Sequence, residues 1–291
     1  MTEVVPLWLV NLLAFITVFA VMASIGTSIR PSLCLDHLRT PWPLIKGLIG
    51  VVVIVPMIGI TLSFAFGLDL AEKVGVTLIV ISPGAPLALR RALTSGGDSS
   101  FAPTLQIVLA VLAVPVVPLW VMIGNAILDT QGVTDVASVA KQVFLAQLLP
   151  LGLGAIVRRI APVRGPWLGT WLGRAGAILL LLALASIIVN VRYSILATHP
   201  WPLAAAAITT LVALAFGHLL GGSSPQVRHS IAIAGAMRNV GLALLIATIN
   251  RTPATVEVII VSYAITAILL VTAYIRWWAN IAVGSDIRRA R

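Results

Sequence analysis

Two adjacent polar residues, Arg238 and Asn239, interrupt a long apolar run in the C-terminal part of the sequence. An arginine at the centre of a membrane costs about 2.5–3.5 kcal/mol on insertion scales, so it needs a polar partner or a water-filled cavity. Arg238 could contact an anion or serve as a fixed internal cation. Alternatively, it could bond to carbonyls that a broken helix leaves free. Asn239 can both donate and accept hydrogen bonds, so the pair is the first candidate for a binding site.

A second interruption lies in an earlier apolar run, where residues 82–86 read Ser-Pro-Gly-Ala-Pro. Proline removes a backbone donor and clashes with the preceding turn, and glycine adds freedom, so a helix should break here. Arg90 and Arg91 follow within a turn or two. At least one of them could be an ordinary cytoplasmic anchor, whereas a substrate path past the break would bring Arg90 near it. The predicted substrate contacts are Arg238, Asn239, Arg90, Pro86, Gly84 and Gly235.

Residues suited to enzyme or metal chemistry are missing from the interior of the apolar runs. All nine carboxylates lie at the ends of runs, in loops or in tails, so none can relay protons or hold a cation at depth. The histidines are His37, His199, His218 and His229. Their spacing does not resemble a metal site, and we expect them at interfaces or helix ends. The sequence predicts no catalytic residue, no metal and no cofactor, so an enzyme is not expected.

The composition places these polar residues in a membrane. Of 291 residues, 59% are hydrophobic and 10% are charged, and the mean hydropathy is +1.08. A soluble domain carries about 25% charged residues, so lipid must solvate part of this apolar surface. Long apolar runs favour helices over a barrel. The net charge of +10 is typical of cytoplasmic helix ends and predicts no nucleic-acid partner, because no basic groove with interleaved aromatic residues is evident.

Nine apolar runs have about the length needed to cross a hydrocarbon core of about 30 Å. The loops between them are brief and leave no room for a soluble domain. The predicted spans are Val5–Ile29, Leu44–Phe66, Val74–Ser95, Phe101–Leu128, Val136–Val157, Ala175–Val191, Pro202–Leu220, Val227–Ile249 and Val256–Ala279, of which the sixth is the shortest. The predicted fold class is therefore an all-α polytopic membrane protein with about nine transmembrane helices.

Positive charge is distributed unequally between the two sides of this arrangement. With the N-terminus outside, 14 Lys and Arg residues fall on inner loops and the tail, and 4 fall on the outer side. This bias predicts an outside N-terminus and a cytoplasmic C-terminus in a plasma or inner membrane. Tryptophans near the span ends fit an aromatic belt at the interfaces. They are Trp42, Trp120, Trp167, Trp171, Trp201, Trp277 and Trp278.

The two interrupted spans, which should unwind near Pro83–Pro86 and Gly235–Arg238, occupy matching places in the chain. Each is the third span of a four-span half when span five links the halves, and the segments starting at Val74 and Val227 look alike. The halves then enter the membrane from opposite sides, as in an inverted-topology repeat with paired broken helices. The predicted division is 1–135 as the first repeat half, 136–165 as the linking helix and 166–291 as the second repeat half.

At these two segments the chain resembles the bile acid:sodium symporter family. The likeness is clearest from Ser82 through Asp98 and from Gly235 through Ala243. Members show a Cys/Ser-Pro-Gly-Gly-x-x-Ser-Asn run followed by Gly-Asn or Gly-Asp, and a Glu-x-Gly-Met-Gln-Asn-x-Gly-Leu-Ala run. The resemblance implies a panel domain and a core domain, with two broken helices crossing in the core. It also implies the nine-helix form, which lacks the first of the ten helices of other members.

The sequence departs from the family where sodium is coordinated. The positions that match the family's sodium ligands hold Ala88, Leu89, Ala102, Gln106, Ala234 and Arg238. A hard cation needs oxygen ligands, and most of these oxygens are gone, including the only acid. Arg238 could replace the bound cation electrostatically. The resemblance therefore implies the fold, while these residues predict that sodium is not required.

Together, the resemblance and the residues predict a secondary transporter of a small organic anion embedded in the lipid bilayer. The alternatives are a sodium-coupled organic anion symporter with an altered ion site, or a membrane receptor that does not transport. Flux into proteoliposomes would separate a transporter from a receptor. The sequence leaves the substrate, the coupling ion, the direction of transport and the oligomeric state open.

Overall fold

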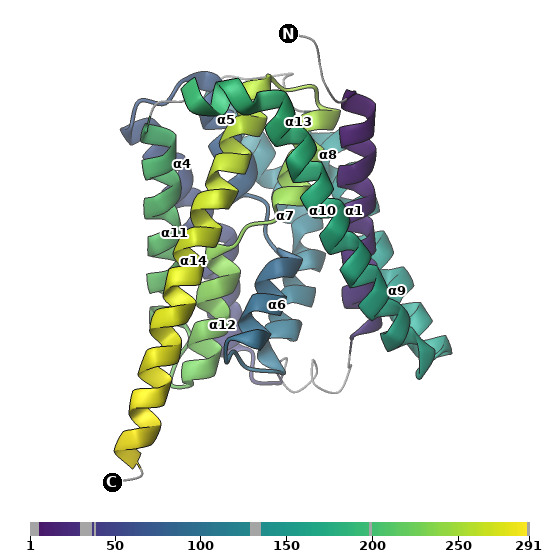
Figure 1. The fold of residues 1–291 in the computed structure, drawn as a ribbon, viewed down its shortest axis with the longest axis vertical. Helices are drawn as coiled ribbons and strands as arrows, with labels where there is room; N and C mark the ends of the chain where they lie inside the picture. The colour runs from purple at the N-terminus through teal and green to yellow at the C-terminus, as the bar shows by residue number, and fades with distance from the viewer. Residues whose placement is uncertain (1–5, 30–36, 38, 129–134, 198–199, 290–291) are drawn as a thin grey trace.

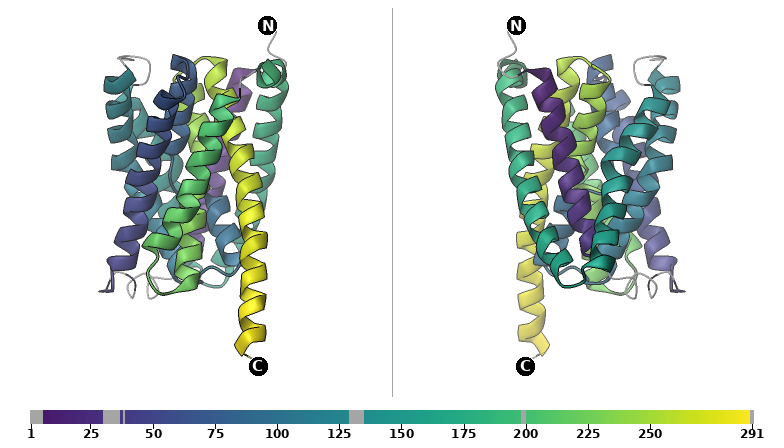
Figure 2. Two further views of the ribbon diagram at one scale, coloured as in Figure 1. Left: turned by 90° about the vertical axis from the view of Figure 1, so that its left-hand side faces the viewer. Right: turned by 90° about the vertical axis from the view of Figure 1, so that its right-hand side faces the viewer.

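The structure is a computed structural model that describes residues 6–29, 37, 39–128, 135–197 and 200–289. Arg30, Cys34 and His199 lie outside the described residues. All regular secondary structure in the described ranges is helical. The helices run roughly parallel, with α1 starting at one end of the bundle and α14 ending at the other (Figures 1 and 2).

Seven helices within the described ranges are long and apolar enough to cross a membrane by length and composition. They cover Trp42–Ala65, Phe101–Leu128, Val136–Ile160, Arg164–Ser186, Trp201–Leu220, Pro225–Ile249 and Ala254–Asn280. Two further predicted spans correspond to α1, Leu7–Thr27, and to the pair α5, Leu70–Val80, and α6, Pro86–Thr94. Apolar runs thus located the helices along the chain.

Close approach of small residues joins α1 to α10, Arg164–Ala197. A Cβ added to Gly169 would lie 1.8 Å from Thr27 Oγ1, and one added to Gly176 would lie 2.4 Å from Val21 Cγ2. The Ser24 hydroxyl donates to the Gly169 carbonyl at 2.6 Å. Small residues let helix backbones meet in this way within membranes. The sequence prediction of a short sixth span from Ala175 was wrong, because this glycine-rich first part of α10 is less apolar but packs on α1.

The fifth predicted span is also one continuous helical segment that packs on α1. It consists of α8, Val136–Val143, the π-helical segment η2, Phe144–Leu148, and α9, Leu149–Ile160. A Cβ on Gly154 of α9 would lie 2.2 Å from the Ala23 carbonyl of α1. α1, α9 and α10 therefore form one closely packed group along one side of the bundle (Figure 2).

The second predicted span contains a π-helical segment that offers carbonyls to side chains. It comprises α3, Trp42–Ile49, η1, Gly50–Ile54, and α4, Val55–Ala65. The wider turn of a π-helix leaves local gaps in the α-helical bonding pattern. Trp120 of α7, Phe101–Leu128, donates its indole N–H to the Val52 carbonyl at 2.8 Å. Trp120 thus ties α7 to η1, and its place in an interfacial belt stays a prediction.

The third predicted span breaks between α5 and α6, close to where the sequence predicted. Asp69 and Glu72 form a reciprocal capping box at the start of α5, which satisfies two orphan backbone donors. Pro83 cannot donate to the preceding turn, and Gly84 adopts a φ of +75° that favours glycine. Pro86 then begins α6, a position where its missing N–H is harmless.

The eighth predicted span breaks between α12, Pro225–Ala236, and α13, Val240–Ile249. Asn239 caps α13, because its side-chain oxygen accepts from the Leu242 N–H at 3.1 Å. The break covers residues 237–239, whereas the sequence predicted unwinding from Gly235 to Arg238. Gly235 stays helical and buried, and α12 continues until Met237 turns extended.

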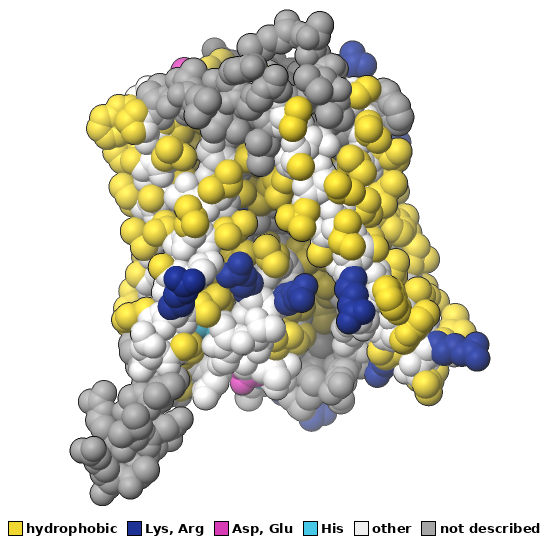
Figure 3. Space-filling model, in the orientation of Figure 1, with side chains coloured by type: hydrophobic (Ala, Val, Ile, Leu, Met, Phe, Trp, Pro, Cys, Tyr) yellow, Lys and Arg dark blue, Asp and Glu magenta, His cyan; other side chains and the backbone are white. Residues whose placement is uncertain are grey.

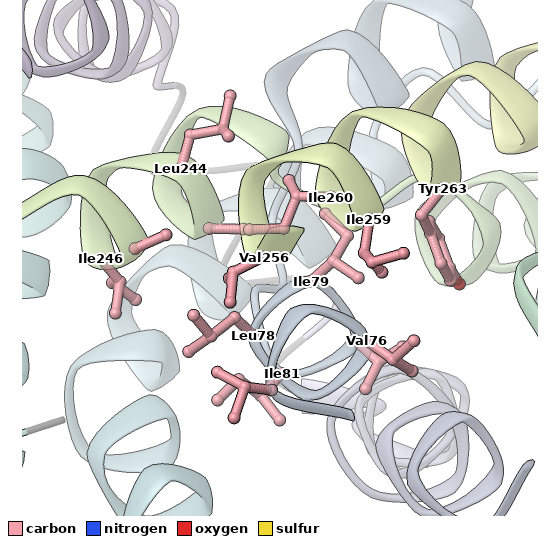
Figure 4. Packing of buried hydrophobic residues seen from close by; sticks show 14 of the residues in the cluster. Val76, Leu78, Ile79, Ile81, Leu244, Ile246, Val256, Ile259, Ile260 and Tyr263 are labelled. Atoms are coloured by element: carbon pink, nitrogen blue, oxygen red, sulfur yellow. The ribbon is translucent and has the colours of Figure 1, made fainter. Parts of the chain in front are cut away.

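The largest hydrophobic cluster lies where α5 and α13 meet α14, Ala254–Arg289. Figure 4 shows Ile79 of α5 beside Ile259 and Ile260 of α14. A Cβ on Gly75 of α5 would lie 2.8 Å from the Ile259 Cβ, so these helices pack closely. α7 and α11, Trp201–Leu220, complete the surroundings of this core. Burial of this apolar surface holds both interrupted helices against α14.

Candidate functional site

The two helix breaks touch each other. The backbone N–H of Asn239 donates to the Ser82 carbonyl at 2.9 Å. The Gly84 carbonyl accepts from the Gln106 side-chain amide at 2.6 Å and from the Asn239 side-chain amide at 3.5 Å. Backbone N–H and carbonyl groups that the two breaks leave without helical partners thus bond to each other and to side-chain amides. Buried polar groups generally need such partners.

Arg238 is buried beside this junction, with 4% of its surface exposed. Its Nη1 donates to the Val51 carbonyl of η1 at 3.0 Å, and its Nη2 donates to the Val80 carbonyl at the end of α5. The Nε–H has no hydrogen-bond partner among the described residues. The guanidinium therefore bridges the Val80 carbonyl, at the end of the broken helix α5, and the Val51 carbonyl of the π-helical segment η1. The bond to Val80 is of the kind that the second interpretation of the sequence describes.

A cavity of about 600 Å³ opens beside this junction. Its walls come from α1 and α10 on one side and from α6, α13 and α14 on the other, together with the break before α13. Apolar side chains make up most of the lining, and hydroxyls are placed among them. Those hydroxyl groups belong to Thr17, Ser24, Ser28, Thr94, Thr170 and Tyr263. This volume and mixed lining are typical of small-molecule sites.

The charged residues that line the cavity, among those that the structure describes, are all arginines. They are Arg90 on α6, Arg174 on α10 and Arg238 at the break before α13, and the described part of the lining contains no carboxylate. Figure 3 shows Lys and Arg side chains along this face, below its middle, on both sides of a hollow. Uncompensated positive charge at a partly apolar cavity favours an anionic ligand over a cationic one.

The structure brings four of the six predicted contact residues to the cavity. Arg238, Asn239, Arg90 and Pro86 line it. Gly84 and Gly235 are not part of its lining. Gly84 instead shapes the first break, and Gly235 packs inside α12, where an added Cβ would lie 3.6 Å from Ala213.

The wall formed by α1 and α10 was missed by the sequence prediction. The sequence prediction placed Arg174 among the 14 basic residues of the inner side, and it did not include Thr17, Ser24 or Thr170 in a site. These helices carry no interruption, so nothing in their sequence marks them as part of a site. The glycines of α10, which allow close packing on α1, were the signal that α10 belongs beside it.

The residues that the sequence resemblance matched to sodium ligands offer few oxygen atoms in the structure. Ala88 and Ala102 belong to a buried apolar cluster, and Leu89 lines the cavity. Gln106 uses its amide N–H on the Gly84 carbonyl. No group of three or more His, Cys, Asp or Glu residues within the described ranges could hold a metal ion.

A second buried polar cluster lies around His229 of α12, away from the cavity lining. His229 Nδ1 is 3.0 Å from the Tyr274 hydroxyl, and its Nε2 is 2.7 Å from the Ser95 hydroxyl. His218 Nε2 lies 2.8 Å from the same Tyr274 hydroxyl. His229 is near a helix end, as expected, but its burial is complete. The cluster ties α6, α11, α12 and α14 together.

Asp98 organises the loop between α6 and α7. Its side chain accepts from the Phe101 and Ser100 backbone N–H groups at 2.8 and 2.9 Å and from the Ser100 hydroxyl at 2.8 Å. Burial raises the pKa of Asp98, but these hydrogen bonds outweigh that effect, and the net pKa is lowered. The Asp98 backbone N–H also donates to the Ser230 hydroxyl at 3.0 Å, and this bond links the loop after α6 to α12.

Comparison with known proteins identifies a transporter family. The family model described as "Sodium Bile acid symporter family" matches residues 15–198, more than half of the chain. That match ends before α11, so the Arg238 break lies beyond it. The chain is also similar to the "Ileal sodium/bile acid cotransporter" of Cricetulus griseus, with 28% identity over 172 residues. This similarity covers 56% of the chain and 47% of that relative, so the chain matches less than half of the relative's length.

Proposed function

Because the chain belongs to the Sodium Bile acid symporter family, we propose that it is a secondary transporter of an organic anion, which binds in the cavity beside the two helix breaks. Membership of this family and seven long apolar helices make it a multi-pass membrane protein. The observation that carries the proposal is a cavity of about 600 Å³ whose described lining residues include three arginines and no carboxylate.

The interrupted helices support binding of an anion at this place. Pro86 at the start of α6, and Val240 and Gly241 at the start of α13, all line the cavity. Helix N-termini carry partial positive charge and favour anions. Paired half-helices near a substrate site are a recurring device of secondary transporters. Asn239 adds a polar side chain at the same point, and the apolar walls receive the rest of the substrate.

The architecture suggests how the site changes access. We assign α1, α8–α9 and α10 to a panel domain and the remaining helices to a core domain, because α1 packs closely on α9 and α10. The cavity lies between the two, so rocking of one against the other would alternate its opening. The nine spans, the inverted repeat (1–135 and 166–291, joined by 136–165) and an outside N-terminus belong to this proposal.

We also propose that transport does not require sodium. The carbonyls of Val51, Val80 and Gly84 already accept from side-chain N–H groups. A sodium ion would need such oxygens as ligands. It would also meet a like charge from Arg238, a repulsion of about 4 kcal/mol at 4 Å in an effective dielectric near 20. The alternatives are a sodium-coupled symporter with an altered site and a receptor that does not transport.

Reconstitution tests the proposal directly. Purified protein in proteoliposomes should accumulate a labelled bile acid such as taurocholate, and replacing sodium with choline should leave this uptake unchanged. Asn239→Ala should reduce uptake. Arg276 lies on the exposed surface of α14, so the control variant Arg276→Gln should leave uptake unchanged. Binding without flux would favour a receptor. Uptake that stops in choline would favour a sodium symporter.

A further inference from the structure

We propose that the cavity holds a second anion subsite, formed by Arg90 and Arg174, and that the preferred substrate is therefore a dianion with two separated anionic groups. This inference rests on the proposed function and names its substrate class. One anionic group faces the helix breaks, and the other lies between the two arginines.

The two arginines come from opposite walls of the cavity. Arg90 projects from α6, on the side of the interrupted helices, and Arg174 projects from α10, which packs on α1. The Arg174 guanidinium carbon lies 5.3 Å from the ring centroid of Trp171, which leaves its N–H donors available. An anion between them would be held by both walls at once, as guanidinium groups suit bidentate carboxylate contacts.

Neither guanidinium has a hydrogen-bond or ion-pair acceptor among the described residues. Three other basic side chains at the same end of the bundle do have one. Arg91 donates to the Thr272 hydroxyl at 2.9 Å, Arg158 to the Pro162 carbonyl at 3.1 Å, and Arg228 to the Gly222 carbonyl. The donors of Arg90 and Arg174 are therefore available to a ligand in the cavity that both residues line.

The separation of the two subsites follows from the geometry of α6. Arg90 lies four residues after Pro86, which begins α6. At 1.5 Å per residue this places the Arg90 backbone about 6 Å along the helix from its N-terminus. An anion at the breaks and another at Arg90 would thus be separated by about 6 Å or more. A medium-length dicarboxylate with an apolar middle matches this spacing and the apolar walls.

The test compares two ligands of equal chain length, octanoate and its dicarboxylate counterpart suberate. Both would be titrated calorimetrically into the purified full chain in nanodiscs of zwitterionic lipid at neutral pH, where carboxylates are ionised. Wild type should bind suberate about tenfold more tightly than octanoate, the effect of two charge-assisted contacts partly exposed to water. Arg90→Gln and Arg174→Gln should each remove most of this preference. Arg276→Gln, which removes an arginine outside the cavity, should keep it.

The outcomes separate this inference from the proposed function. Equal binding of octanoate and suberate by wild type overturns the second subsite but leaves anion transport intact. A preference that survives in both glutamine variants also overturns it. Loss of the preference when phosphatidylglycerol is added would assign the two arginines to a lipid headgroup instead. If neither octanoate nor taurocholate binds or is transported, the proposed function itself fails.

Discussion

The backbone N–H of Asn239 donates to the Ser82 carbonyl across 2.9 Å, so the two interrupted helices are joined at their breaks. Residues 157 positions apart thereby satisfy each other's backbone groups in the interior. The same asparagine caps α13 and reaches the Gly84 carbonyl. One side chain therefore supports the geometry of both breaks and one wall of the cavity.

Asn239→Ala should reduce both stability and substrate binding. Loss of the cap on α13 removes about 1 kcal/mol, and loss of the Asn239 amide takes a donor from the Gly84 carbonyl. Asn239→Asp should keep the cap, because a carboxylate oxygen can accept from Leu242, but it should weaken binding of an anion. Thermal unfolding in detergent and taurocholate binding would measure the two effects. Equal binding by wild type and Asn239→Asp would contradict an anion contact here.

Gly84→Ala should destabilise the fold through its backbone. Gly84 has a φ of +75°, which costs about 1–3 kcal/mol for a residue with a Cβ. Space is not the obstacle, because an added Cβ would be 3.6 Å from its nearest neighbours. Gly152→Ala is the matched control. It lies in α9 with nothing within 4 Å of an added Cβ, and alanine there should stabilise the helix by about 0.5–1 kcal/mol. If Gly84→Ala leaves the melting temperature unchanged, the predicted backbone strain at residue 84 is refuted.

Much of the fold could be predicted because its signals are local. Apolar runs mark the helices, and proline with glycine at 83–84 marks the first break. The second break lacks proline, so its position depends on Arg238 reaching Val51 and Val80 across the bundle. Tertiary contacts of that kind leave no local pattern, which is why unwinding was predicted from Gly235, two residues too early.

The candidate site was predicted only on the side of the interrupted helices. Arg238, Asn239 and Arg90 stand out because charge and amide groups are rare within apolar runs. Arg174 does not stand out, since an arginine near a helix end is ordinary. Its place in the cavity depends on α10 packing against α1. The glycines of α10 indicate close packing but do not identify the partner helix.

Asp98 should make the stability of the fold depend on pH. Its pKa in the folded chain is lowered by the Phe101 and Ser100 hydrogen bonds, despite burial that raises it. The unfolded carboxyl, with a pKa near 3.9, takes up its proton first as pH falls. The stabilisation is therefore present above that value and is lost as pH falls through the folded pKa. Asp98→Asn should lower the melting temperature at neutral pH, and the difference from wild type should vanish in acid.

Ser224→Ala is the control for this pH effect. Ser224 caps α12 by accepting from the Val227 N–H at 3.4 Å, and a hydroxyl does not titrate in this range. Its loss should lower the melting temperature by a similar amount at every pH. If the Asp98→Asn difference also stays constant from neutral to acidic pH, the carboxylate of Asp98 is not the source of the stabilisation.

Arg238 should act through its positive charge as well as through its hydrogen bonds, and two substitutions separate these roles. Arg238→Gln removes the charge and leaves the Val51 and Val80 carbonyls incompletely bonded, at about 1–3 kcal/mol for an unsatisfied buried group. Arg238→Lys keeps the charge, but a lysine ammonium is a point charge without the planar fork that spans both carbonyls. Both variants should therefore melt at lower temperature than wild type. Only Arg238→Gln should lose affinity for taurocholate, because Arg238 lines the cavity as a cation.

Sodium dependence completes the test of Arg238. Wild type should bind and transport equally in sodium and choline, since Arg238 occupies the carbonyls with its own donors. Ala234→Glu combined with Arg238→Gln returns an acid and an uncharged amide to the two positions that match family ligands. That double variant should gain binding that depends on sodium, because the repulsion is removed and oxygen ligands are restored. Transport by wild type that follows an imposed sodium gradient would refute the cation-replacement idea. Equal affinity in Arg238→Gln and wild type would leave Arg238 only the structural task of holding the two broken helices to η1.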